Sequence, residues 1–331
     1  MLQSVLMIGL VLAGIVGGTH MASEVSVRRA ASSFPPTGKF VAVEGVRLHY
    51  VAAGSGRPVV FLHGAGTSLL DFTMTMFDQA AGEYQVIAFD RPGHGYSEEP
   101  RGEIATPQVQ ARLLRGALRE LNIEKPVLVG HSWGGAVALA YAIEYPNDTS
   151  GIVLLGTVAY AENYGPIPSF MRLPEVPVVG GTLTSATLLI VGKTMAESMF
   201  EGAFRPNSIT AAPPGYVRAT SALSLRPSQF RANAKQVLHT KSSLTLMEPR
   251  YGDISVPTTI VTGGADPMAK PQWHSYPLHD AIPHSKLVVL PGVGHMIAPV
   301  APNAIMEAIR TTFAAEPTGG RPALASAAKQ Q

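Results

Sequence analysis

Short apolar runs alternate with longer amphipathic stretches along most of this chain. The apolar runs cover residues 58–62, 84–89, 127–130, 152–155, 258–262 and 286–290. Such short continuous runs are typical of strands buried on both faces of a sheet. Helical periodicity marks 107–121, 134–145 and 303–313, and Thr106 with Pro107 suits the start of the first helix. This alternation predicts an α/β fold with a largely parallel sheet covered by helices on both faces.

A hairpin precedes the alternation. Residues 40–43 and 46–52 read as strands on either side of Glu44 and Gly45, a pair typical of a tight turn. We therefore expect antiparallel strands at one side of the sheet.

The N-terminal segment has a composition of its own. Residues 1–23 contain no charged side chain, and 5–18 are apolar or glycine. Three interpretations stay open: an uncleaved membrane anchor, a cleaved secretory signal, or a true start at Met21. The first two would place the protein on a membrane, in the periplasm or outside the cell. Residues 24–39, with two prolines and one glycine near their end, are expected to form a linker.

The rest divides around an irregular segment. We expect residues 40–160 and 241–314 to form the core, 161–240 to be an insertion, and 315–331 to be a disordered tail. The insertion is rich in large apolar side chains. They include Phe170, Met171, Met195, Met199, Phe200 and Phe204. Most of these should pack the insertion onto the core, and a minority should line a pocket.

Composition excludes several classes of protein. The 331 residues carry a formal net charge of +2 and no dense basic run, so no nucleic-acid partner is expected. The absence of cysteine excludes disulfides, thiolate metal sites and a cysteine nucleophile. No spacing of metal ligands or phosphate-binding loop is present, so we expect neither metal nor cofactor.

The strongest chemical signal is a G-x-S-x-G motif between a predicted strand and a predicted helix. It reads Gly130-His131-Ser132-Trp133-Gly134. A sharp strand-to-helix turn brings backbone against backbone, so the flanking positions must lack side chains. The turn lifts the Ser132 hydroxyl above the sheet edge, beside the positive end of a helix. Ser132 is the predicted nucleophile.

A serine hydroxyl needs a general base, and the base needs an orienting acid. His295 follows the run 286–290, and Asp266 follows the run 258–262. Both therefore belong to loops at the carboxyl edge of the sheet, where Ser132 also lies. Asp90 follows a strand too, but its loop reads as a structural turn in which the carboxylate binds backbone N–H groups.

An oxyanion formed at the substrate needs two prearranged N–H donors. We assign them to Trp133, which follows the nucleophile, and to Ala65 in the loop after the first parallel strand. His63 in the same loop is expected to be a packed, hydrogen-bonded histidine.

With these motifs in this order, residues 40–314 resemble the α/β-hydrolase fold family, in its serine-nucleophile, esterase- and haloperoxidase-like branch. The motifs are His63-Gly64, residues 90–97 (DRPGHGYS), 130–135 (GHSWGG), Gly264-Ala265-Asp266 and Gly294-His295. The resemblance implies an eight-stranded sheet whose second strand is antiparallel, and a mostly helical cap over residues 161–240. Relatives with dehalogenase or epoxide hydrolase activity carry aspartate where this chain has Ser132.

These features favour a serine hydrolase that cleaves esters or lactones of a small to medium apolar substrate through an acyl-enzyme. Hydrolysis of amides, peptides or carbon–carbon bonds, perhydrolysis and acyl transfer use the same triad in this fold. A ligand-binding protein on the hydrolase scaffold is the alternative outside enzymes.

Overall fold

Eight strands form one sheet at the centre of the computed structural model, which describes residues 2–315. The strands are β1 (Lys39–Val43), β2 (Val46–Ala53), β3 (Pro58–Leu62), β4 (Gln85–Phe89), β5 (Val127–His131), β6 (Gly151–Leu155), β7 (Thr258–Gly263) and β8 (Lys286–Leu290). Their order is β1-β2-β4-β3-β5-β6-β7-β8, and β2 is antiparallel to both of its neighbours while the others run parallel. The predicted mostly parallel sheet and its antiparallel second strand are confirmed.

The opening hairpin follows from its turn residues. Glu44 and Gly45 both take positive φ, at 51° and 76°, which suits the twist of two antiparallel strands joined by a two-residue loop. Val43 then pairs with Val46.

Helices cover both faces because successive strand residues point to opposite sides. In β3, Val60 and Leu62 belong to one buried apolar cluster, and Val59 and Phe61 belong to the other. The first cluster includes α4 (Pro107–Glu120), α5 (Trp133–Glu144) and α10 (Ser275–Ala281). The second includes α2 (Leu70–Thr73), α3 (Phe77–Ala81), α11 (Ile297–Val300) and α12 (Pro302–Ala314).

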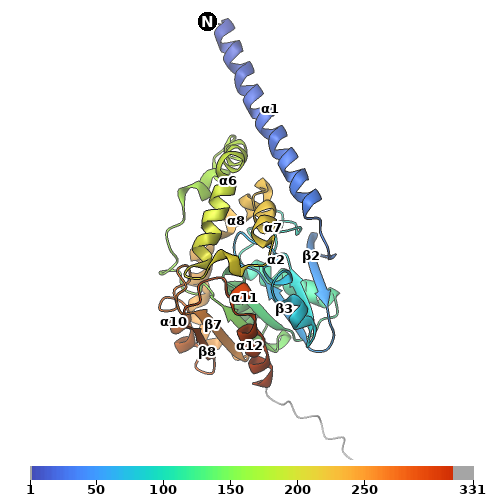
Figure 1. The fold of residues 1–331 in the computed structure, drawn as a ribbon, viewed down its shortest axis with the longest axis vertical. Helices are drawn as coiled ribbons and strands as arrows, with labels where there is room; N and C mark the ends of the chain where they lie inside the picture. The colour runs from blue at the N-terminus through green and yellow to red at the C-terminus, as the bar shows by residue number, and fades with distance from the viewer. Residues whose placement is uncertain (1, 316–331) are drawn as a thin grey trace, which may run out of the picture.

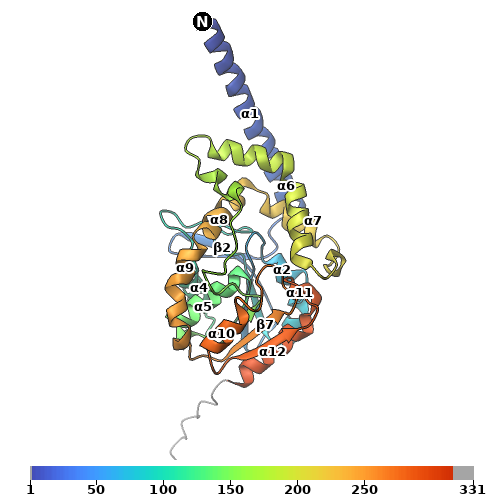
Figure 2. The same cartoon turned by 90° about the vertical axis from the view of Figure 1, so that its left-hand side faces the viewer.

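The chain between β6 and β7 is helical, in the region predicted as an insertion. Its elements are η2 (Ser169–Glu175), α6 (Gly180–Phe204), η3 (Ile209–Ala211), α7 (Tyr216–Ser224), α8 (Pro227–Leu238), α9 (Thr240–Met247) and η4 (Glu248–Asp253), and a short η1 (Pro146–Asp148) precedes β6. Helices α6, α7 and α8 gather above the sheet in both views (Figures 1 and 2). We call residues 161–240 the cap.

The N-terminal segment is one helix, α1 (Leu2–Ser33), which packs against α6 and α7 near its end and extends away from the body (Figure 1). The linker predicted over 24–39 is therefore wrong for residues 24–33. The helix ends just before Pro35 and Pro36, since proline lacks an N–H donor and disfavours helical backbone in the preceding residue. Within the described part of the chain, no helix has both the length and the apolarity needed to cross a membrane. Residues 316–331 of the predicted tail lie outside the described residues.

Candidate active site

The G-x-S-x-G motif forms the sharp turn that the sequence predicts, between β5 and α5. Ser132 has φ 53° and ψ −115°, a strained conformation for a residue with a side chain. A methyl group at Gly130 would lie 2.5 Å from the Gly134 carbonyl oxygen, and one at Gly134 would lie 2.3 Å from the Leu62 carbonyl oxygen. The two glycines therefore allow the backbone approach that exposes Ser132 at the end of β5.

Asp266 and His295 are joined by a short hydrogen bond, although 29 positions separate them in the sequence. His295 Nδ1 lies 2.7 Å from Asp266 Oδ2, and both residues are buried. The other carboxylate oxygen accepts from the backbone N–H groups of Met268 and Ala269 at 2.8 and 2.9 Å. Burial raises the pKa of Asp266, but the charge of His295 and these hydrogen bonds outweigh it and hold the pKa below its usual value. Asp266 is thus an anion fixed on His295 Nδ1, and Nε2 makes no hydrogen bond with any of the described residues.

The loop that carries His295 is held by the end of α6 and the segment after it. The His295 N–H donates to the Ala203 carbonyl oxygen at 3.1 Å. The Gly294 N–H donates to Asn207 Oδ1 at 2.8 Å, and Asn207 Nδ2 donates to the Gly292 carbonyl oxygen at 3.1 Å. The cap therefore supports the position of His295 directly.

Ser132 lies at the junction of two cavities, and His295 lines both of them. The larger cavity has a volume of about 220 Å³, with Tyr164, Ile167, Val237 and His274 in its wall. The smaller has about 60 Å³, and its wall includes Thr67, His131, Met199 and Phe200. Met199 and Phe200 are thus the minority of the predicted apolar cap residues that reach a pocket. A larger space of about 410 Å³ between α4, α5 and α9 lies away from Ser132, and none of the predicted site residues lines it.

The loop after β3 places Ala65 in the walls of both cavities, and Trp133 lines the larger one. No acceptor for the Ala65 N–H is present within the described residues. The Trp133 N–H is the first of α5 and has no partner inside the helix. The neighbouring Gly66 is fixed by the cap, since its N–H donates to Asn233 Oδ1 at 2.8 Å and its carbonyl accepts from Ser224 Oγ at 2.6 Å.

The buried guanidinium of Arg91 supports the loop after β3 through hydrogen bonds to its backbone. Arg91 donates to the carbonyl oxygens of His63 and Gly64, both at 2.8 Å, and also to the side-chain oxygens of Gln110 and Gln236. Burial lowers the pKa of Arg91 to about 9. Burial and the charge of Arg91 hold the pKa of His63 well below its usual value, so His63 is a neutral, packed histidine, as the sequence predicts. The predicted turn at Asp90 is also confirmed, because its carboxylate accepts from the N–H groups of Leu69 and Tyr96.

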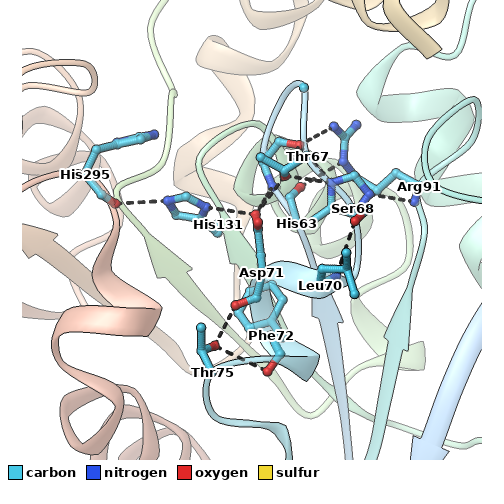
Figure 3. Close-up of polar contacts among 12 residues, drawn as sticks. His63, Thr67, Ser68, Leu70, Asp71, Phe72, Thr75, Arg91, His131 and His295 are labelled. Carbon is cyan, nitrogen blue, oxygen red and sulfur yellow. Dashed lines mark hydrogen bonds and ion pairs between the residues drawn. The ribbon is translucent and has the colours of Figure 1, made fainter. Parts of the chain in front are cut away.

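A polar network links His295 with this loop through Asp71 (Figure 3). His131 Nε2 lies 3.0 Å from the His295 carbonyl oxygen, and its Nδ1 lies 3.8 Å from Asp71 Oδ2. The same Asp71 oxygen accepts from Thr67 Oγ1 at 2.7 Å. Tyr216 in α7 donates to the other oxygen, also at 2.7 Å.

With this geometry in place, comparison with known proteins identifies the family. A protein-family model described as "alpha/beta hydrolase fold" matches residues 57–302. The chain belongs to the α/β hydrolase fold family.

Proteins similar to this α/β hydrolase carry different enzyme names. The 2-hydroxy-6-oxo-6-phenylhexa-2,4-dienoate hydrolase of Burkholderia cepacia is 26% identical over 268 residues, which are 78% of this chain and 90% of that protein. A thermophilic esterase from Thermogutta terrifontis has a TM-score of 0.63 and 24% identity, covering 82% of this chain and 97% of that chain. The enol-lactonase from Burkholderia xenovorans has a TM-score of 0.67 and 20% identity, with coverages of 83% and 100%. The structural matches show a shared fold. Membership of the α/β hydrolase family, together with the hydrolase among its sequence relatives, identifies this chain as a hydrolase.

Three residues of this α/β hydrolase site have no signal in the sequence that we could read. Asp71 and Tyr216 come together from positions 145 residues apart. His274 lies in a segment without strand or helix periodicity, yet it lines the larger cavity. Among the described residues, no three histidine, aspartate or glutamate side chains lie together in an arrangement that could hold a metal ion.

Proposed function

We propose that this α/β hydrolase is a serine hydrolase that cleaves carboxylic esters or lactones of small to medium, uncharged substrates. The observation that carries the proposal is the position of Ser132 between two cavities that His295 also lines, with His295 bonded to the anionic Asp266. Nucleophile, base and orienting acid then meet at the place where a substrate can lie.

The chemistry follows the proposed roles. Ser132 Oγ attacks the ester carbonyl carbon while His295 Nε2 takes the hydroxyl proton, and Asp266 stabilises the imidazolium that forms. The N–H groups of Ala65 and Trp133 bind the oxyanion of the tetrahedral intermediate. Collapse breaks the ester C–O bond, and His295 returns the proton to the departing alcohol. Water, deprotonated by His295, then hydrolyses the acyl-enzyme and releases the acid.

The volumes of the two cavities limit the substrate. About 60 Å³ accommodates roughly two water-sized groups, whereas 220 Å³ accommodates about seven. One side of the scissile bond should therefore be short and the other of medium length.

The charge of the cavity walls favours uncharged esters over the dienoates that occur in the names of several relatives. A dienoate carries a carboxylate, and a buried carboxylate needs a cationic partner. Among the described residues, neither cavity is lined by lysine or arginine. Carbon–carbon bond hydrolysis of such dienoates is therefore the second candidate, favoured by the sequence relatives but not by the walls of the site.

The test uses a panel of p-nitrophenyl esters of increasing acyl length, the dienoate of the Burkholderia relative, and the Ser132→Ala variant. We expect turnover of short and medium esters, none of the dienoate, and loss of turnover in Ser132→Ala. Ser242→Ala, on the exposed face of α9, is the matched control and should retain turnover. Retained turnover in Ser132→Ala would remove Ser132 from the mechanism. Labelling of Ser132 by a fluorophosphonate without hydrolysis of any ester would instead favour amide, carbon–carbon or acyl-transfer chemistry.

A further inference from the structure

His274 is a buried histidine in the wall of the larger cavity. Its contacts determine which of its two ring nitrogens carries the proton. Its Nδ1 accepts hydrogen bonds from the backbone N–H groups of Ala159 and Tyr160, at 3.2 and 3.3 Å. A ring nitrogen that accepts is unprotonated, so in the neutral imidazole the proton is on Nε2.

The neutral form is the one that the surroundings favour. Burial lowers the pKa of His274 to about 4; the charge of Asp266 raises it and that of His295 lowers it further. At neutral pH, His274 therefore presents one N–H donor and no charge.

This donor has no partner among residues 2–315, the part of the chain that the structure describes. Within the described residues His274 Nε2 makes no hydrogen bond, and it is not among the fully buried side-chain atoms that lack one, so this nitrogen is accessible from the cavity. The indole N–H of Trp133, in the same wall, is already used, because Trp133 Nε1 donates to Thr240 Oγ1 at 2.9 Å. An N–H donor that faces a cavity and has no acceptor in the protein can bind an acceptor brought by a ligand.

We propose that His274 is a specificity-determining residue whose Nε2–H donates a hydrogen bond to a second oxygen of the substrate, such as an ether, ketone or lactone ring oxygen. The proposal rests on the proposed ester or lactone hydrolysis and narrows its substrate class. The remaining wall of the larger cavity is apolar, with Val158, Ile167, Val237 and Met268. The preferred substrate thus carries an apolar chain of medium length interrupted by one uncharged acceptor.

Two pairs of substrates that differ only by exchange of a CH₂ group for oxygen test this. p-Nitrophenyl hexanoate is compared with p-nitrophenyl γ-methoxybutanoate, and pentyl acetate with ethoxyethyl acetate. The pairs place the oxygen on the acyl or the alcohol side, whichever enters the larger cavity. We expect the wild-type enzyme to prefer the ether-containing member of one pair by about 3- to 10-fold in kcat/KM, the range of one neutral hydrogen bond.

The variant His274→Asn distinguishes recognition of the substrate oxygen by Nε2–H from support of the Ala159 and Tyr160 backbone by Nδ1. The Asn carbonyl oxygen can take the place of Nδ1 and accept from Ala159 and Tyr160, while the Nε2–H donor is lost. We expect the ratio of the two kcat/KM values to fall toward one in His274→Asn and to recover in part in His274→Gln, whose amide reaches the Nε2 position. His284→Asn, outside both cavities, should keep the wild-type ratio.

The outcomes are distinguishable. An equal loss on both members of each pair in His274→Asn would make His274 a purely structural residue and overturn the proposal. Equal wild-type turnover of both members would also overturn it, while ester hydrolysis itself would stand. Absence of turnover on all four esters would overturn the proposed function and this proposal with it.

Discussion

The Tyr216 hydroxyl donates a hydrogen bond to Asp71 across the boundary between cap and core, at 2.7 Å. Asp71 also accepts from Thr67, in the loop that carries Ala65. We expect Tyr216→Phe to lower the free energy of unfolding by about 1.5–3 kcal/mol, since a hydrogen bond to a charged group is lost. Because the loop loses part of its support, kcat should fall several-fold with a smaller change in KM.

Urea unfolding and steady-state kinetics on a p-nitrophenyl ester measure both effects. Tyr141→Phe is the matched control, since Tyr141 is a buried tyrosine of α5 that packs against Tyr145 away from this loop. Equal losses of kcat in the two variants would show that the Tyr216–Asp71 bond has no effect on the active site beyond stability.

Asp266→Asn should reduce kcat by roughly 10³- to 10⁴-fold while the protein remains folded. The asparagine oxygen can still accept from the N–H groups of Met268 and Ala269. Its NH₂ group then faces His295 Nδ1 and forces that nitrogen to accept, which moves the ring proton to Nε2 and removes the base. Steady-state kinetics measures the change in kcat, and circular dichroism checks that the variant is folded. Asp253→Asn, on the surface, is the control and should leave kcat unchanged. A decrease in kcat of less than tenfold in Asp266→Asn would exclude Asp266 as the orienting acid.

Gly134→Ala should prevent stable folding, because its methyl group would lie 2.3 Å from the Leu62 carbonyl oxygen in a rigid strand. The loss should exceed about 3 kcal/mol. Gly181→Ala provides the contrast, since nothing lies within 4 Å of the added methyl group and the residue is in α6. It should raise the free energy of unfolding by up to about 1 kcal/mol. A thermal melt of the two variants measures both changes. A folded Gly134→Ala with wild-type stability would refute the close packing at the sharp turn between β5 and α5.

Met199→Ala should enlarge the smaller cavity and extend the range of groups accepted there by one or two carbons. Met199 lines that cavity yet is 40% exposed, so its truncation should cost little stability. The chain-length profile of kcat/KM measures the change, on both the acyl and the alcohol side of the ester. Met171→Ala, in the cap but outside both cavities, is the control and should not change the chain-length profile. An unchanged profile in Met199→Ala would mean that the smaller cavity does not hold the substrate.

Stability should fall as the pH drops from about 6.5 toward 4. Burial lowers the pKa of His94 to about 3 and that of His274 to about 4, whereas an unfolded histidine titrates near 6.5. Between these values the unfolded chain binds more protons, so each buried neutral histidine removes up to about 1.4 kcal/mol per pH unit as the pH falls. Urea unfolding at pH 7 and pH 5 should show this loss, and His94→Gln should reduce its slope. An identical slope in His94→Gln would show that His94 is not buried in the neutral form.

The sheet and the chemical motifs could be predicted because their signals are local. The apolar runs before Ser132, Asp266 and His295 mark strands, and parallel strands bring their carboxyl ends to one edge. Gly130 and Gly134 indicate the sharp turn for the same reason, because two backbone segments can approach this closely only where glycine stands.

The contacts between distant parts of the chain could not be predicted, because they join positions far apart. His274 meets Ala159 and Tyr160 across more than 110 residues, and Asp71 meets Tyr216 across 145. No periodicity encodes such pairs. The sequence also does not indicate that α1 extends into the predicted linker, because this depends on the packing of Ala30 into the protein; the helix continues until Pro35 and Pro36 end it.

The attachment of the His295 loop to Ala203 and Asn207 has a consequence for how enzymes of this kind diversify. Recombination that exchanges the whole cap between relatives would bring in new cavity walls and, at the same time, replace the support of His295, the proposed general base. Selectivity and turnover would then change together. Exchanges that keep residues 203–207 would change the range of substrates while the support of His295 stays the same.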